Sequence, residues 1–170
     1  MSKKTIIIFS FMILVFVLCG CSVESQVFDR EEAFASMVNL GQDTNQSIEL
    51  VTFKNYEEVN LDSVSAVGLK INSQNPICFT YNYGLRFFLF SEQNNKWIEV
   101  YDDVIYSSLE PFVREHKEKF AIECSIEFWP DIPPDTKASE LRIYVEGKIM
   151  RDGQPTEEIV SSFIDMPISR

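Results

Sequence analysis

The side chains best suited to catalysis are few in this sequence, and their neighbours give catalysis little support. The one histidine, His116, lies in the charged run Arg114-Glu115-His116-Lys117-Glu118-Lys119. A metal site or a catalytic triad built on His116 would need a second ligand or a nucleophile beside it, and the run contains neither a cysteine nor another histidine. We therefore expect a surface histidine, no catalytic residue, no metal site and no cofactor.

Carboxylates are plentiful, and some stand close together in the sequence. Asp102 is followed by a second aspartate, and Asp131 and Asp135 flank a double proline. Paired carboxylates can hydrolyse glycosides or bind Ca²⁺, but neither spacing matches the ligand ladder of a calcium-binding loop. Turn residues are the simpler interpretation. Aromatic rings next to such turns can contact sugars or peptides, so we predict an interaction surface. It consists of Tyr101, Asp102, Trp129, Asp131 and Asp135.

The first twenty residues have the pattern of a signal peptide. Lys3 and Lys4 precede an apolar run from Ile6 to Leu18. As a helix this run would span about 20 Å, less than the roughly 30 Å of a bilayer core, which disfavours a permanent transmembrane helix. An ordinary secretory peptide or an uncleaved anchor remains an alternative.

The end of this segment, Leu18-Cys19-Gly20-Cys21, resembles a bacterial lipobox. In that family of precursors, a lipid is attached to the acceptor cysteine and the chain is cut before it. Cys19 departs from the Ala, Ser or Thr that is commoner at its position. The resemblance implies a signal peptide over residues 1–20, a lipid on Cys21, and a location on the extracytoplasmic face of the cell membrane. We expect residues 21–46 to form the lipidated N-terminus and a tether.

The charge balance narrows the classes of partner. The chain has 15 basic and 26 acidic residues, net −11; residues 1–20 contain Lys3, Lys4 and no acid, so the remainder has 13 basic and 26 acidic residues, net −13. Nucleic-acid binding requires clustered Lys and Arg, so no nucleic-acid partner is expected. An acidic body is also repelled by anionic lipid, so the lipid on Cys21 would have to hold the protein at the membrane.

From Ser47 onward the hydrophobic period is two, which predicts strands. The clearest cover 120–129 and 141–150; in the second, Leu141, Ile143, Val145 and Ile149 share one face. Residues 109–119 have the strongest helical pattern, whereas 31–40 could form only a marginal short helix. Other strands are predicted at 48–53, 64–71, 77–83, 85–90, 96–101 and 158–164. Seven or eight short strands predict an all-β antiparallel sandwich over 47–170.

The segments Val67–Ser73, Asn95–Val100 and Leu141–Val145 resemble the immunoglobulin-like domains of bacterial surface lipoproteins. The resemblance covers about residues 64–166 and implies an immunoglobulin-like fold and a surface setting. Cys78 and Cys124, with Trp97 between them, then resemble the cysteine pair of such domains around a core tryptophan. Export also favours a disulfide between them, although strand alternation would turn Cys78 away from the core. Two buried thiols are the alternative.

These patterns favour a non-enzymatic, lipid-anchored envelope protein whose sandwich binds a protein or another ligand. Two alternatives stay open. A stiff Pro130–Pro134 loop could inhibit an extracellular protease, or Trp129 could belong to a carbohydrate-binding accessory domain.

Overall fold

The computed structural model describes residues 28–40, 44, 46–53, 59–60, 65–102, 110–124 and 137–169. In this part of the chain, β-strands dominate and are accompanied by one α-helix, α2 (Arg30–Met37), and a short 3₁₀ helix, η1 (Tyr81–Gly84). The strands are β1 (Ile48–Thr52), β2 (Val59–Asn60), β3 (Ser65–Ile71), β4 (Ile77–Phe79), β5 (Arg86–Ser91), β6 (Lys96–Asp102), β7 (Phe112–Arg114), β8 (Lys119–Cys124), β9 (Ala138–Arg151) and β10 (Gln154–Ser169).

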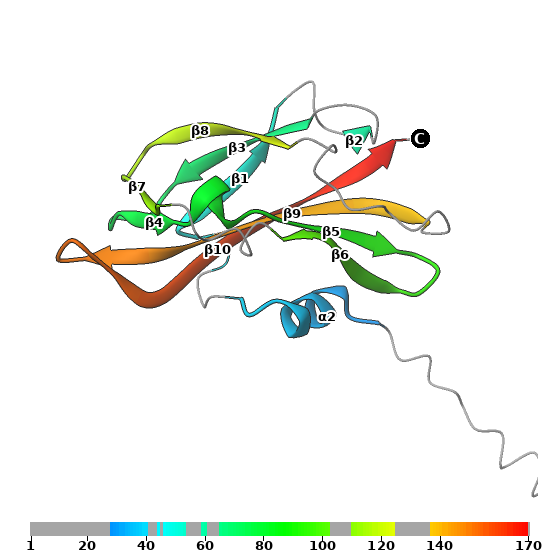
Figure 1. Ribbon diagram of the computed structural model, residues 1–170. Coiled ribbons are helices and arrows are strands. Elements are labelled where there is room, and N and C mark those ends of the chain that lie inside the picture. The colour runs from blue at the N-terminus through cyan, green and yellow to red at the C-terminus, as the bar shows by residue number, and fades with distance from the viewer. Residues whose placement is uncertain are drawn as a thin grey trace, which may run out of the picture.

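The strands form two sheets that pack as a sandwich (Figure 1). The smaller sheet has the order β1-β3-β8 and is antiparallel. In the larger sheet, β9 pairs with β10 along one side and with β5 and then β4 along the other. β6 extends β5, β7 extends β4, and β2 pairs in parallel with β10. The predicted all-β sandwich is confirmed, whereas the immunoglobulin-like topology stays a prediction.

The core between the sheets comes from the alternation that the sequence shows. In β9, Leu141, Ile143 and Val145 are fully buried on the inner face, as their period of two predicts. The core residues are Ile48, Leu50, Val67, Leu69, Ile71, Ile77, Phe79, Leu85, Phe87, Leu89, Val100, Ile122, Ala138, Leu141, Ile143, Val145, Ile149, Val160 and Met166.

β9 and β10 form one long hairpin that crosses the molecule (Figure 1). Asp152 and Gly153 both have positive φ, 52° and 76°, as a two-residue type I′ turn requires. The Asp-Gly pair therefore sets the turn between β9 and β10. β10 begins four residues before the predicted strand and ends five residues after it.

The predicted helix at 109–119 is wrong. Within this segment the described chain forms β7, a turn at residues 115–118 and the start of β8. β7 is held by pairing with β4, where Arg114 lies opposite Ile77 and Phe112 opposite Phe79. Pairing with a strand more than thirty residues away outweighs the local helical preference.

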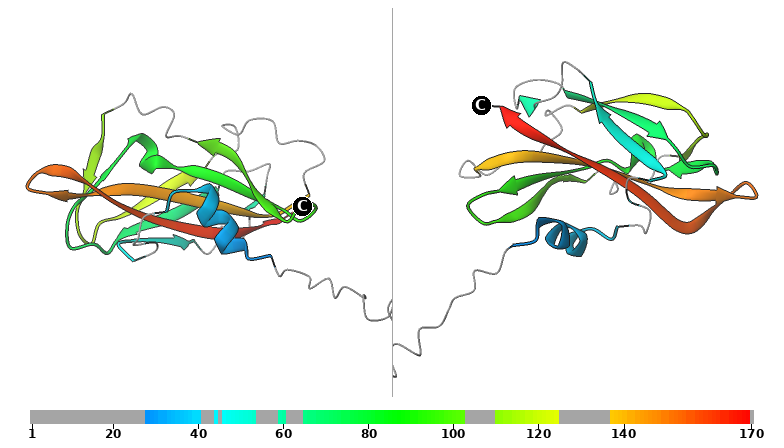
Figure 2. Two further views of the ribbon diagram at one scale, coloured as in Figure 1. Left: turned by 90° about the horizontal axis from the view of Figure 1, so that it is seen from below. Right: turned by 180° about the vertical axis from the view of Figure 1, so that it is seen from behind.

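The interpretation of residues 21–46 as a tether is also wrong where the structure describes them. Residues Arg30–Met37 form α2, which lies on the outer face of the larger sheet (Figure 2). Asp29 caps its N-terminus, accepting hydrogen bonds from the amides of Glu31 and Glu32 at 2.9 and 3.0 Å. Phe34 is fully buried. The folded body therefore begins well before residue 47.

Candidate functional site

The most extensive polar and aromatic cluster among the described residues lies between α2 and the larger sheet. Phe34 of α2 points into a second apolar cluster, separate from the inter-sheet core. We call this cluster, together with Arg142 and its ion-pair partners, the helix-docking site. Its members are Phe34, Val38, Phe88, Phe90, Trp97, Tyr144, Arg142, Glu31 and Asp165, with Phe28, Leu40 and Phe163 at the margin.

Strand alternation supplies the sheet side of this site. In β5, Phe87 and Leu89 face the inter-sheet core, so Phe88 and Phe90 face α2. Phe34 and Phe88 pack edge to face, with centroids 5.0 Å apart, and Phe34 and Trp97 do so at 5.9 Å. Such edge-to-face contacts are favourable because the ring edge is electropositive and the face is electronegative. Trp97 is buried, as predicted, but beneath α2 and not between the two sheets.

Arg142 lies fully buried at the centre of the helix-docking site. Its guanidinium donates from Nε and Nη2 to Asp165, both at 2.6 Å, and from Nη1 and Nη2 to Glu31 at 3.1 and 2.7 Å. The guanidinium carbon is 3.9 Å from the centroid of the Phe163 ring and about as close to Trp97 and Phe34, at 4.3 and 4.4 Å. This geometry combines two-pronged carboxylate pairing with cation–π stacking.

The charge on Arg142 is maintained despite its burial. Desolvation alone lowers the pKa of a guanidinium, but the hydrogen bonds and charges of Asp165 and Glu31 outweigh it, so the pKa of Arg142 is raised. Because Glu31 belongs to the first turn of α2, the cation in the sheet binds the helix directly. Arg30 adds a second link through its ion pair with Glu140 of β9.

Among the described residues, two donors in or next to the helix-docking site lack an acceptor. Trp97 Nε1 and Arg30 Nε are both buried without a hydrogen-bond partner. A buried unpaired donor costs about 1–3 kcal/mol, so the docking of α2 is weaker than its contacts alone suggest. The arrangement holds a helix in place and presents no nucleophile beside a base.

Tyr144 makes the helix-docking site sensitive to alkaline pH. Burial raises the pKa of its phenol, and the negative charge of Glu146, which accepts its hydrogen bond at 2.8 Å, raises it further. The unfolded phenol titrates near 10, so above about pH 10 only the unfolded state loses this proton, and stability falls by up to about 1.4 kcal/mol per pH unit. Below pH 10 the contribution is complete.

We expect the difference in unfolding free energy between the wild type and Tyr144→Phe to shrink by about 1 kcal/mol between pH 8 and pH 11. Urea titrations of both proteins at the two pH values measure it. All other groups are the same in both proteins, so their contributions cancel in this difference. An unchanged difference would contradict the assignment.

Four of the eight predicted site residues lie outside the described part of the chain. These are the lipid acceptor Cys21 and the loop residues Trp129, Asp131 and Asp135. Tyr101 and Asp102 end β6, with their backbones opposite Phe87 and Arg86, and their side chains are not described. The predicted interaction surface therefore stays a prediction.

Cys78 lies in β4 between Ile77 and Phe79, which are buried in the core, and is itself half-buried on the other face. It is a free thiol here, in contrast to the predicted disulfide. Strand alternation explains this, because it turns Cys78 away from the core. Burial raises the pKa of the Cys78 thiol. Cys124 ends β8 opposite Ser65, and its side chain lies outside the described ones.

His116 lies in the turn between β7 and β8, where its Nδ1 is 2.9 Å from the carbonyl oxygen of Ser73. His116 is half-buried, and this contact connects the turn to residue Ser73. Among the described residues, no group of three or more His, Cys, Asp and Glu side chains is arranged to hold a metal ion. No helix in the described part has the length and apolar character needed to cross a bilayer.

Strand alternation alone does not predict the helix-docking site, although two signals in the sequence point to it. The run Phe87-Phe88-Leu89-Phe90 does not alternate, and such a run indicates a strand covered on both faces. Asp29 with Glu32 three residues later has the form of a helix N-terminus. Together they indicate a nearby helix that covers the second face of β5.

The comparisons with known proteins give no family assignment. No protein-family model matches the chain. Searches of curated proteins and of solved structures also find no match.

Proposed function

We propose that this protein is a non-enzymatic, lipid-anchored protein of the cell envelope, and that its β-sandwich is an interaction module on the extracytoplasmic face of the membrane. The observation that carries the proposal is the docking of α2, because residues 28–40, which come only a few positions after the lipobox-like segment, belong to the folded body. Phe28, at the margin of the helix-docking site, is seven residues from Cys21.

This spacing limits how far the sandwich can lie from its anchor. Seven residues span at most about 25 Å when fully extended. A lipid on Cys21 would therefore keep the α2 face of the sandwich close to the membrane surface. The net charge of −13 after residue 20 makes the lipid, and not electrostatic attraction, the force that holds the protein there.

Substitution of the two neighbouring cysteines tests the anchor. We expect Cys21→Ala to abolish incorporation of labelled palmitate and to move the protein from the membrane to the soluble fraction. Cys19→Ala is the matched control, because it removes a thiol two residues away and should leave labelling and fractionation intact. Persistence of label and membrane association in Cys21→Ala would refute a lipid on this residue.

Crosslinking on intact cells tests the interaction module. A specific partner should be recovered with the wild type and lost with Cys21→Ala, which is no longer held at the membrane. Turnover by the purified protein in a panel of hydrolase substrates, abolished by a single carboxylate substitution, would instead identify an enzyme.

A further inference from the structure

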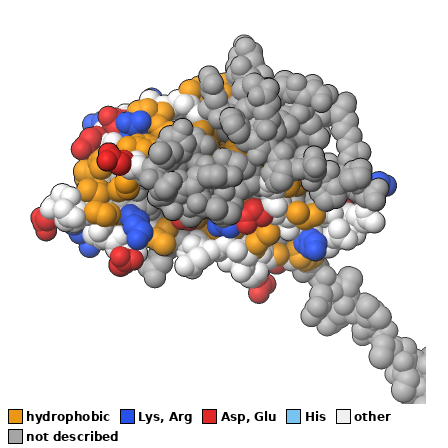
Figure 3. Space-filling view, viewed as in Figure 1, with side chains coloured by type: hydrophobic (Ala, Val, Ile, Leu, Met, Phe, Trp, Pro, Cys, Tyr) orange, Lys and Arg blue, Asp and Glu red, His pale blue; other side chains and the backbone are white. Residues whose placement is uncertain are grey.

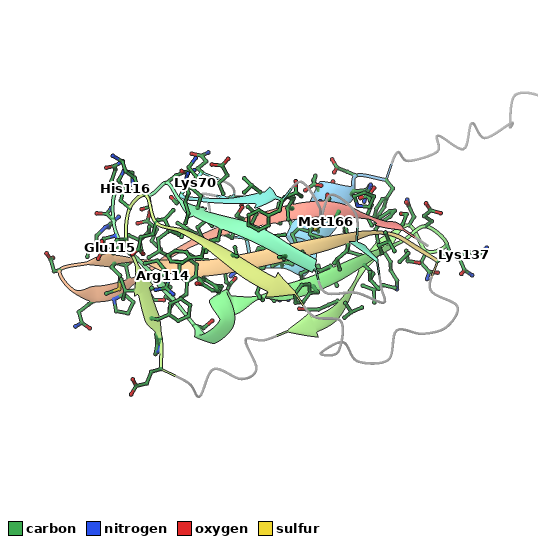
Figure 4. The ribbon with its side chains drawn as sticks, turned by 90° about the horizontal axis from the view of Figure 1, so that it is seen from above. Lys70, Arg114, Glu115, His116, Lys137 and Met166 are labelled. Atoms are coloured by element: carbon green, nitrogen blue, oxygen red, sulfur yellow. The ribbon has the colours of Figure 1, made fainter. Side chains whose placement is uncertain are left out.

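Arg114 lies at one end of the sandwich, beside Glu115 and His116 and opposite the end that carries Lys137 (Figure 4). It is the last residue of β7, and its partner in β4 is Ile77, a core residue. Arg114 therefore points toward the gap between the two sheets. Its guanidinium carbon is 4.3 Å from the centroid of the Phe120 ring, which belongs to the other sheet.

Two further rings complete an aromatic niche around this guanidinium. Its carbon is 4.8 Å from the Phe112 centroid and 5.8 Å from that of Tyr83. Tyr83 and Phe112 pack edge to face at 4.8 Å. The three rings come from η1, β7 and β8. We call Arg114, Tyr83, Phe112 and Phe120 the Arg114 niche.

Arg114 differs from the other arginines of the described chain in having no carboxylate partner. Arg30, Arg86, Arg142 and Arg151 each form an ion pair. Arg114 donates from Nη2 to the neutral hydroxyl of Tyr83 at 3.2 Å, and its Nε is buried without a partner. Arg114 is only partly buried as a residue, so solvent reaches part of its side chain.

Tyr83 holds its place at the cost of backbone strain. Its φ is 62°, in the left-handed region. Glycine adopts this conformation easily, but for a bulky side chain such as tyrosine it is unfavourable. Such strain persists only where surrounding contacts over-determine it, and it occurs often at ligand sites. Here it places the ring on Phe112 and the hydroxyl on Arg114, so the Tyr83 backbone helps to orient the guanidinium.

The charges around the niche favour a monoanion with an apolar body. Figure 3 shows acidic and basic side chains intermingled with hydrophobic ones on the described surface. Glu115 follows Arg114, and Glu118 binds the backbone amide of Glu115. A dianion such as phosphate would be repelled more strongly by these acids and by the net charge of −13 that the chain has after residue 20. A carboxylate matches the planar fork of a guanidinium, and an attached apolar group can contact the rings.

We propose that the Arg114 niche binds a carboxylate carried on an apolar or aromatic group, as in an acidic side chain or the C-terminus of a partner protein. This proposal rests on the proposed function, because it states the chemistry that the interaction module recognises. It also differs from a purely structural role in which Arg114 covers aromatic rings, since that role needs no anion.

Chemical protection of the intact protein in detergent tests the niche. Phenylglyoxal modifies arginine, and mass spectrometry of the digest gives the rate at each site. At about 50 mM, phenylacetate should slow the modification of Arg114 about threefold, as a dissociation constant of about 25 mM gives. Arg151, whose side chain is 59% exposed and which is ion-paired to Glu158, is the internal control and should keep its rate.

Three comparisons make the result decisive. Neutral phenylacetamide, and sodium chloride at equal ionic strength, should leave the Arg114 rate unchanged. Tyr83→Phe, which keeps the ring and removes the hydroxyl, should reduce protection by phenylacetate without loss of the folded state. Equal slowing of Arg151, absence of protection, or better protection by inorganic phosphate would overturn the proposal. None of these readouts depends on the lipid, so failure here is distinguishable from failure of membrane anchoring.

Discussion

Phe34→Ala is expected to release α2 from the sandwich. Phe34 is fully buried in the folded protein, with a relative exposure of 0%. Its ring contacts those of Phe88, Trp97, Tyr144 and Phe163. Removal of a buried phenylalanine ring costs about 3–5 kcal/mol. An eight-residue helix has too few internal hydrogen bonds to persist alone in water. The substitution should therefore undock the helix while the two sheets remain folded.

Hydrogen exchange measures this release. The amide of Val38 donates to the carbonyl of Phe34 at 2.9 Å, and its protection should fall to that of an unfolded segment in the variant, while amides of β9 and β10 stay protected. Met37→Ala is the matched control, because Met37 lies in the same helix and is 41% exposed; its effect should stay within about 0.5 kcal/mol. Unchanged protection of α2 in Phe34→Ala would show that the ion pairs hold the helix without the ring.

Gly147→Ala is expected to be the second most damaging change, at about 3 kcal/mol. A Cβ at this position of β9 would lie 2.5 Å from Ile77 Cγ2 and 3.0 Å from both the Cys78 carbonyl oxygen and Phe79 Cδ1. The close atoms belong to a buried strand and its backbone, so β4 would have to shift away from β9. Loss of the pairing between these strands would also loosen β7 and the Arg114 niche.

Denaturation in urea compares this variant with Gly68→Ala. A Cβ at Gly68 would lie 2.8 Å from Val51 Cγ2, and Val51 is 38% exposed, so this side chain can rotate into solvent. We expect Gly68→Ala to cost less than about 1 kcal/mol. Equal midpoints for the two variants would contradict the view that packing of β4 on β9 limits residue 147.

The sequence by itself determined the class of fold, because a period of two along a strand places alternate side chains on opposite faces. Leu141, Ile143 and Val145 were assigned to one face of their strand, and that face is the core. Asp152-Gly153 determined the long hairpin through its tolerance of positive φ. These features depend on residues that are neighbours in the chain, so a local pattern carries them.

Only the tertiary structure decided what covers each face. Alternation places Arg142 opposite the core, but its burial depends on Glu31 and Phe34, more than a hundred residues away. Within the segment 109–119, the described residues form β7 and the start of β8 because strands distant in sequence pair with them. The Arg114 niche likewise draws its rings from three separate segments. Burial and long-range pairing outweigh the small local differences in helix and strand preference, so a pattern read from neighbouring residues could not predict them.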